Sequence, residues 1–435
     1  MLRHLPLIIV ALAGCSESRS TIDAAADAAT DSPMDAADAD GSSDTGPAPD
    51  AGPLGCADLL EDRLVALDES MVLGQIHPAA AWDGEGIWVV YSRPDDAGLF
   101  DTYATRRGCD GAALVEPFSV SSAPAFGNDI DPELAIAGDR MLIAWNTDDG
   151  VGPNNLSVRY RVFGLDGTPV GDDRTLETTH MGAAVTGNQL GASVAGTPSG
   201  GFVIAGGRGG VAGVTAFSAY TQPLTRDGAP DGATLEPMIN ADASQTATAV
   251  DVDTDGTVWV AYTESIVEPA SEHLMVRSFA AAAPEVGVEG LLSSAGASVL
   301  AADGAVWVAF SGLIASEINL RLVDATVPLA SRTAAVWGDR GRIESAVRLA
   351  VAPDGALAAV WFRNVSGFTN EIYAARFSAG NPPTVAAPMR VDPGTAPAYQ
   401  PALTHVEGDY WFMAFAEGES PNFRLTGRFM TLAAE

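Results

Sequence analysis

Few side chains in this sequence have the types and spacing that enzymes use for catalysis. The 23 Lys plus Arg residues are all arginine, which excludes Schiff-base or general-base chemistry by lysine. The patterns G-x-S-x-G, H-E-x-x-H, C-x-x-C and G-x-G-x-x-G, which mark common hydrolases, zinc peptidases and dinucleotide enzymes, do not occur. A formal net charge of −33 argues against nucleic-acid binding, because the chain would repel phosphates. These features favour a binding role over an enzymatic one.

One short motif resembles a metal loop. Asp251, Asp253 and Asp255 alternate ahead of Gly256, which is how an oxygen-rich calcium loop opens. An EF-hand loop needs Glu at its twelfth position, and this sequence has Tyr262 there. The neighbouring repeats carry plain Asp-Gly turns at the same place. We therefore expect a turn here, and calcium is the one cofactor that the sequence suggests.

A second group of polar residues is predicted to gather around one opening of a ring. His77-Pro78, Asp131-Pro132 and Gln400-Pro401 occupy equivalent places just before the first strand of three repeats. Loops at such places share one face of a ring of repeats, and convergent polar groups in a hollow are the usual sign of a binding site. The alternative is an ordinary solvated rim. The predicted ligand-binding face consists of His77, Asp129, Asp131, Gln189, Gln245, Glu344 and Gln400.

The elements that position these residues are short strands in a repeating unit of about 54 residues. A turn is followed by alternating apolar residues that end in an aromatic residue, and Asp-Gly before such a run is a strong hairpin signal. Seven copies occur, and the third copy is degenerate. Their last residues are Tyr91, Trp145, Gly206, Tyr262, Phe310, Trp361 and Phe415.

The repeats predict an all-β fold, a seven-bladed β-propeller of four-stranded antiparallel blades, with six or eight blades as alternatives. The last unit supplies only three strands, so we expect the segment at about 63–72 to pair beside 423–430 and close the ring. Tryptophans on the second strands and arginines on the third strands recur from blade to blade. Such repetition predicts core packing for the tryptophans and structural pairing for the arginines.

The first residues of the chain have the pattern expected of an export signal. Arg3 precedes an apolar run that is too short to span a bilayer, and this run ends in Leu12-Ala13-Gly14-Cys15. The segment resembles the lipobox of bacterial lipoproteins. This resemblance implies that 1–14 is a signal peptide, that Cys15 carries acyl chains, and that Ser16 directs the protein to the outer membrane. An ordinary secretory signal with an incidental cysteine is the alternative.

Residues 15–55 are rich in Ala, Asp and Ser and offer almost nothing to bury, so we expect a disordered tether between the lipid and a propeller domain over 56–435. Cys56 and Cys109 are the only other cysteines. In an oxidising compartment they are expected to form a disulfide, and two unpaired thiols are the alternative.

The repeats also resemble those of the sialidase-like propeller superfamily. The Gly-x-x-Trp part of the sialidase Asp-box stands at 256–259, 304–307 and 408–411, but its Asp position holds Thr254, Ala302 and Val406. We therefore expect a non-enzymatic, monomeric binding module that is anchored to the membrane by lipid. Its expected partner is a glycan, a peptide or an envelope protein. The alternative is a carboxylate-dependent glycan hydrolase that uses Asp131 and Glu344.

Overall fold

The computed structural model describes residues between Cys56 and Leu432. It describes residues 56, 62–68, 70, 72, 74–122, 127–148, 156–180, 183–185, 189–209, 217–236, 243–266, 271–279, 297–302, 304–311, 317–323, 333–337, 343–366, 369–378, 386–394, 396–419 and 421–432. All of them belong to the compact unit Pro53–Glu435. The predicted signal peptide and tether, including Cys15, lie outside the described residues. No helix among the described residues is long and apolar enough to cross a membrane.

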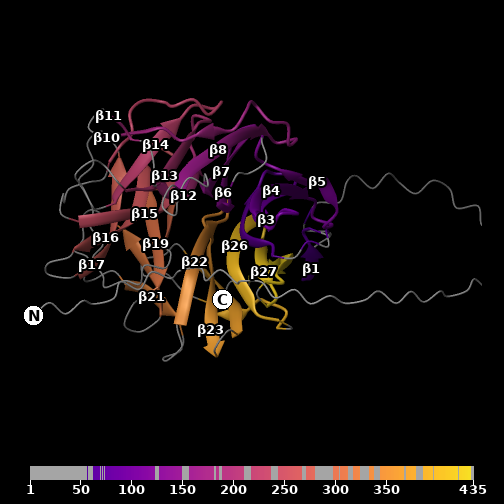
Figure 1. Cartoon of the computed structure of the whole chain (residues 1–435). Helices are drawn as coiled ribbons and strands as arrows, with labels where there is room; N and C mark the ends of the chain where they lie inside the picture. The colour runs from indigo at the N-terminus through magenta and orange to yellow at the C-terminus, as the bar shows by residue number, and fades with distance from the viewer. Residues whose placement is uncertain are drawn as a thin grey trace, which may run out of the picture. The chain divides into compact units, whose positions relative to one another are not determined.

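The fold is a seven-bladed β-propeller, as the repeats predicted, and its blades follow one another in chain order (Figure 1). Blade 1 consists of β2 (Ile76–Trp82), β3 (Ile87–Pro94), β4 (Phe100–Arg107) and β5 (Ala113–Ser119). Blade 2 consists of β6 (Asp129–Ala137), β7 (Arg140–Asp148), β8 (Leu156–Gly164) and β9 (Arg174–Thr175). The small pair β10 (Thr178–His180) and β11 (Ala183–Val185) precedes blade 3, which has β12 (Gln189–Gly196), β13 (Phe202–Arg208) and β14 (Ser218–Leu224).

The remaining four blades repeat the antiparallel arrangement. Blade 4 shows β15 (Ala243–Val252), β16 (Val258–Ile266) and β17 (Ser271–Phe279). Blade 5 has β18 (Ser298–Ala302), β19 (Ala305–Ser311), β20 (Ile318–Val323) and β21 (Thr333–Trp337). Blade 6 has β22 (Ile343–Val351), β23 (Leu357–Ser366), β24 (Thr369–Phe377) and β25 (Met389–Arg390). Blade 7 has β26 (Ala398–Glu407), β27 (Tyr410–Glu417), β28 (Arg424–Thr431) and, as its outer strand, β1 (Arg63–Ala66).

The core lies between blades rather than at one central point. Five second-strand tryptophans are at most 1% exposed, which confirms the prediction that they belong to the core: Trp88, Trp145, Trp307, Trp361 and Trp411. The sixth, Trp259, is partly buried against the apolar cluster of blades 4 and 5. Trp88 of blade 1, for example, packs in one cluster with Met141 and Ile143 of blade 2. Because every blade buries apolar side chains against both neighbours, the ring must close for the fold to be stable.

Third-strand arginines pair with acids and backbone carbonyls beside them, as their repetition predicted. Their partners are Asp83 for Arg106 (2.7 Å), the carbonyl of Val120 for Arg161 (3.0 Å), the carbonyl of Leu432 for Arg376 (3.2 Å) and the carbonyl of Val391 for Arg428. Three of these contacts link neighbouring blades and that of Arg106 lies within blade 1, so these four side chains are engaged in structural pairing.

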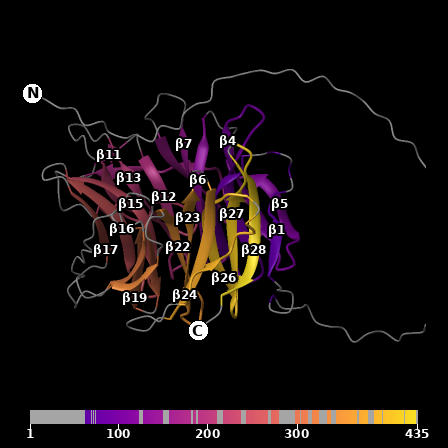
Figure 2. The ribbon, with the colours of Figure 1, turned by 90° about the horizontal axis from the view of Figure 1, so that it is seen from below.

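The two ends of the propeller domain close the ring together. β1 pairs antiparallel with β28 from Arg63 opposite Phe429 to Ala66 opposite Thr426, which confirms the predicted closure (Figure 2). The Cys56–Cys109 disulfide is also confirmed, with a Cα–Cα distance of 5.3 Å. Cys109 lies in the same apolar cluster as Val65 and Leu67, so the bridge secures the segment around β1 to blade 1.

Candidate functional site

The first strand of each blade lines the central channel, and most of these strands carry the same irregularity. An extra residue interrupts the register of β2, β6, β12, β15, β22 and β26. At four of these bulges a non-glycine residue adopts a left-handed backbone, with φ of 54° at His77, 52° at Asp131, 51° at Ala346 and 52° at Gln400. Such a conformation costs about 1–2 kcal/mol per residue. Repeated strain of this kind is typical of functional sites, where a bulge redirects a side chain.

The strands therefore begin earlier than the sequence predicted. The three X-Pro pairs were expected just before the first strands, but the bulges place them inside β2, β6 and β26. Proline has no backbone N–H to donate to a neighbouring strand. It is tolerated at these positions because the bulge already interrupts the hydrogen bonds between the first and second strands.

The bulges deliver three predicted residues to one cavity of about 180 Å³ at the mouth of the channel. His77 Nδ1 lies 2.8 Å from Asp131 Oδ1, and the His77 backbone N–H donates to Gln400 Oε1 at 2.9 Å. These contacts connect blades 7, 1 and 2. We call the cavity and these three side chains the channel mouth.

The floor of the channel mouth is an ion pair that the sequence did not reveal. Arg348 of β22 lies 3.1 Å from Glu133 Oε1 of β6, although the two belong to blades on opposite sides of the ring. Both residues also line a second cavity of about 160 Å³, deeper in the channel, to which all seven first strands contribute. The ion pair thus stands between the mouth and the interior of the channel.

The channel shifts the acidity of its two carboxyl groups in opposite directions. Burial raises the pKa of Asp131, but its hydrogen bond to His77 and the positive charges of His77 and Arg348 outweigh this, so the pKa lies below its usual value. Burial also raises the pKa of Glu133; Arg348 opposes this shift, Asp131 adds to it, and the pKa lies above its usual value. One cavity therefore holds a carboxyl group that favours ionisation and another that retains its proton more readily.

The two other glutamines of the predicted face, Gln189 and Gln245, lie outside the channel mouth. Gln189 is 2% exposed, accepts the Val158 N–H at 3.0 Å and donates to the Leu176 carbonyl at 3.1 Å, so it fastens blade 3 to blade 2. Gln245 is buried, and its amide donates to Glu264 at 3.2 Å.

The structure describes the side chain of one of the two remaining acidic members of the predicted face. Asp129 is 1% exposed, in the interface between blades 1 and 2, and burial raises its pKa to about 6. Glu344 pairs with Arg363 in the β22–β23 ladder, and its side chain lies outside the described residues. Of the predicted face, the described structure therefore gathers His77, Asp131 and Gln400 in one cavity.

A signal for the missed ion pair exists in the repeats. Each first strand contributes an equivalent residue to the lining of the deeper cavity, and it is Ala or Ser in five blades, at Ala79, Ser193, Ala249, Ser298 and Ala402. Glu133 and Arg348 are the two exceptions. An alignment of the blades at the bulge would have revealed them as charges in a ring of small residues.

The calcium candidates are engaged in local hydrogen bonds. Asp253 and Asp255 accept backbone N–H groups of their own turn at 2.7 and 2.8 Å. Asp251 accepts the N–H of Ala301 in blade 5 at 2.7 Å, and burial raises its pKa to about 6. In the part of the chain that the structure describes, no three His, Cys, Asp or Glu side chains form a group that could hold a metal.

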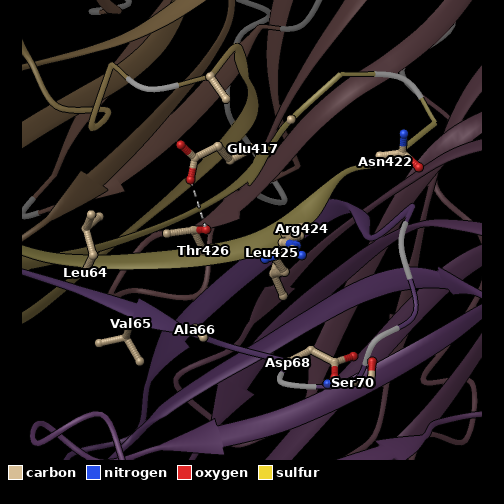
Figure 3. A pocket seen from close by; sticks show the side chains of 12 residues that line it. Leu64, Val65, Ala66, Asp68, Ser70, Glu417, Asn422, Arg424, Leu425 and Thr426 are labelled. Atoms are coloured by element: carbon tan, nitrogen blue, oxygen red, sulfur yellow. Dashed lines mark hydrogen bonds between the residues drawn. The ribbon is translucent and has the colours of Figure 1, made fainter. Parts of the chain in front are cut away.

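A larger cavity of about 570 Å³ opens where the chain after β1 leaves β28 (Figure 3). Leu64, Val65 and Ala66 line it from β1, and Arg424 and Thr426 line it from β28. The Thr426 hydroxyl donates to Glu417 across its upper part at 3.5 Å. No residue of the predicted face lines this cavity, and none of its lining residues has a left-handed backbone apart from Gly418. The channel mouth is therefore the better candidate site.

No protein-family model and no curated protein matches the chain. Among solved structures, an ulvan lyase of polysaccharide lyase family PL25, bound to -[GlcA(1-4)Rha3S]-, is 12% identical with a TM-score of 0.53, covering 86% of this chain and 96% of that one. A protein of unknown function from Dyadobacter fermentans is 12% identical with a TM-score of 0.51, covering 85% and 98%. The sialidase of Trypanosoma rangeli is 9% identical with a TM-score of 0.43, covering 84% of this chain and 56% of its own. At 12% identity, the likeness to the ulvan lyase and to the Dyadobacter fermentans protein shows a similar fold and nothing more.

Proposed function

We propose that the propeller binds one unit of a glycan at the channel mouth and catalyses no reaction on it. The observation that carries this proposal is the repeated left-handed bulge, which holds His77, Asp131 and Gln400 around one cavity at a cost in backbone strain. A polar cluster that is fixed before the ligand arrives loses little entropy on binding.

The chemistry of the channel mouth fits a neutral ligand that is rich in hydroxyl groups. The carboxylates of Asp131 and Glu133 accept hydrogen bonds, and His77 and Arg348 donate them, so each charge already has a partner. Sugar hydroxyls both donate and accept, and they can join such a network without adding charge. A cavity of about 180 Å³ is smaller than most small-molecule sites, which favours one sugar unit with the rest of its chain outside.

The test is glycan-array binding followed by calorimetry, with the full chain carrying Cys15→Ser so that no lipid interferes. We expect His77→Ala and Gln400→Ala each to weaken binding about tenfold or more, because a hydrogen bond to a charged or prearranged group contributes roughly 1.5–3 kcal/mol. The matched control is His273→Ala on β17, away from the channel. Unchanged binding by both channel variants would refute the assignment of the site.

Glycan hydrolysis is a second candidate because Asp131 and Glu133 have pKa values shifted in opposite directions within one cavity. Glycosidases need one protonated and one ionised carboxyl group. The sequence suggested Asp131 together with Glu344, whose side chain lies outside the described residues. An assay for reducing ends on the glycan samples used for binding decides between the two candidates. If the wild type produces new reducing ends over hours and the Glu133→Gln variant does not, the protein is a hydrolase.

We also propose that the protein is a monomer in the cell envelope, held at the outer membrane through Cys15. The lipobox at 12–15 supports this, because several acyl chains at ~0.8 kcal/mol per buried CH₂ anchor a protein stably.

We expect the wild type to fractionate with membranes and Cys15→Ser to be released from them, because the lipid is the proposed attachment. Fractionation with detergent-phase partitioning measures this, and Ser16→Ala serves as the control that keeps the acceptor cysteine. Membrane association of the Cys15→Ser variant would contradict the proposal.

A further inference from the structure

Seven equivalent residues, one from each first strand, form a ring around the channel. Each pairs with the same position on the second strand of its own blade, as Glu133 does with Ala144 and Arg348 does with Val360. Five of the seven are small: Ala79, Ser193, Ala249, Ser298 and Ala402. The ring therefore holds one acid, one base and otherwise side chains that are too short to reach across the channel.

The two serines of this ring are turned toward neighbouring strands. Ser193 Oγ accepts the backbone N–H of Val250 at 3.0 Å, and Ser298 Oγ accepts that of Leu349 at 3.1 Å. Each of these bonds connects one blade to the next. Glu133 and Arg348, by contrast, meet across the channel, from blade 2 to blade 6, at 3.1 Å.

Stability is a poor explanation for this ion pair. The side chains of Glu133 and Arg348 are 29% and 40% exposed, and the loss of hydration offsets much of the attraction between charges inside a fold. Five blades build the same ring with Ala or Ser, so the fold does not require charged residues at this level. The role of the pair is better sought in the two cavities that it touches.

Glu133 and Arg348 lie where these two cavities adjoin. Both residues line the channel mouth, of about 180 Å³, and both line the deeper cavity, of about 160 Å³. Because the pair joins opposite sides of the ring at this boundary, the mouth ends on a floor of side chains. A ligand that enters the mouth therefore meets a closed end.

We propose that Glu133 and Arg348 make the channel mouth selective for the terminal unit of a glycan chain. A terminal unit has one glycosidic link, so it can enter a closed cavity while the rest of the chain stays outside. An internal unit has a link on each side, and both neighbours would have to leave by the same opening. This inference rests on the proposed glycan binding and adds that the site distinguishes chain ends from chain interiors.

The first test measures whether the ion pair closes the floor, and it needs no glycan. A thiol is introduced in the deeper cavity with Ser298→Cys, in the full chain with Cys15→Ser, where Cys56 and Cys109 are already bonded to each other. Mass spectrometry then follows its reaction with N-ethylmaleimide. We expect Glu133→Ala combined with Arg348→Ala to speed this reaction about tenfold or more, because the thiol no longer depends on a rare opening of the floor.

Two matched controls accompany the labelling. Asp139→Ala combined with Arg226→Ala removes an exposed ion pair of the same residue types outside both cavities, and it should leave the rate unchanged. A thiol placed on β17 with His273→Cys, instead of Ser298→Cys, should react at one rate with and without the channel pair.

The second test uses the Cys15→Ser chain with no channel substitution and measures the selectivity for chain ends. The probes are three neutral linear polysaccharides, amylose, xylan and galactan, each offered intact and after partial acid hydrolysis at equal mass. Hydrolysis multiplies the number of chain ends without changing the mass. For a polymer that binds, we therefore expect the mass needed for half-saturation to fall in proportion to the mean chain length.

Three results would overturn the inference. Equal labelling rates with and without the channel pair would show that Glu133 and Arg348 do not close the floor. Half-saturation at equal mass of intact and cut polymer would show that the site accepts internal units. Binding of none of the probes in either form would count against glycan binding itself and remove the basis of the inference, and the labelling rates would distinguish this outcome from an open floor.

Discussion

Removing the disulfide with the double substitution Cys56→Ser and Cys109→Ser is expected to lower the free energy of unfolding by about 4 kcal/mol. The two cysteines are 53 residues apart, and the loop-closure entropy of a loop of this length gives that magnitude. Cys109 is 6% exposed in the cluster that holds Val65 and Leu67, so its loss also loosens the closure of the ring. Urea unfolding in a Cys15→Ser background measures the difference.

Reduction provides the control for this measurement. Dithiothreitol should destabilise the parent by the same amount and leave the double variant unchanged, since only the parent has a bridge to break. A loss below about 1 kcal/mol would mean that the bridge contributes little beyond the contacts of β1, against the entropic estimate.

Leu67→Ala is expected to destabilise the propeller by about 3 kcal/mol, within the range of 2–5 kcal/mol for buried leucines. Leu67 follows β1 directly and is 0% exposed. Its Cδ2 lies 3.0 Å from the position that a Cβ would occupy at Gly427 of β28, so it fills the space that this glycine leaves. Truncation would leave a cavity at the joint between blades 7 and 1, because β1 and β28 hold the backbone on both sides.

Leu64→Ala is the matched control, because Leu64 belongs to the same closing segment but is 47% exposed. We expect it to change the free energy of unfolding by no more than about 0.5 kcal/mol. Equal effects of the two substitutions in urea unfolding would show that the closing segment does not contribute through burial.

The sequence was sufficient to predict the blades, because each hairpin repeats the same turn residues and the same alternation of apolar residues. These signals are local and do not depend on the length of the loops between strands. Asp255-Gly256 illustrates this: Gly256 adopts φ of 86°, and its N–H donates to the Asp253 carbonyl at 2.8 Å. Ring closure by 63–66 was predictable for a similar reason, since the last unit lacked one strand.

The channel mouth was only partly predictable, because its geometry depends on a bulge that no local rule demands. Glycine is the residue that favours φ above zero, yet His77, Asp131 and Gln400 adopt it, held there by tertiary packing. Gln189 and Gln400 look equivalent in the sequence but differ in the structure. Gln400 is itself the bulge residue of β26, whereas Gln189 stands two places before the bulge residue Gly191 of β12. Gln400 therefore reaches the mouth, whereas Gln189 is buried between blades.

The position of the disulfide has a mechanical consequence. If the chain is held at the membrane through Cys15, any pull along the chain arrives at Cys56 before it arrives at β1. The sulfur bridge then passes that force to Cys109 in blade 1, and the four residue pairs between β1 and β28 carry little of it. Without the bridge, the same pull would separate β1 from β28 one residue pair at a time, beginning at Arg63. Under such a load the covalent bond would allow a strand of four residues to keep the ring closed.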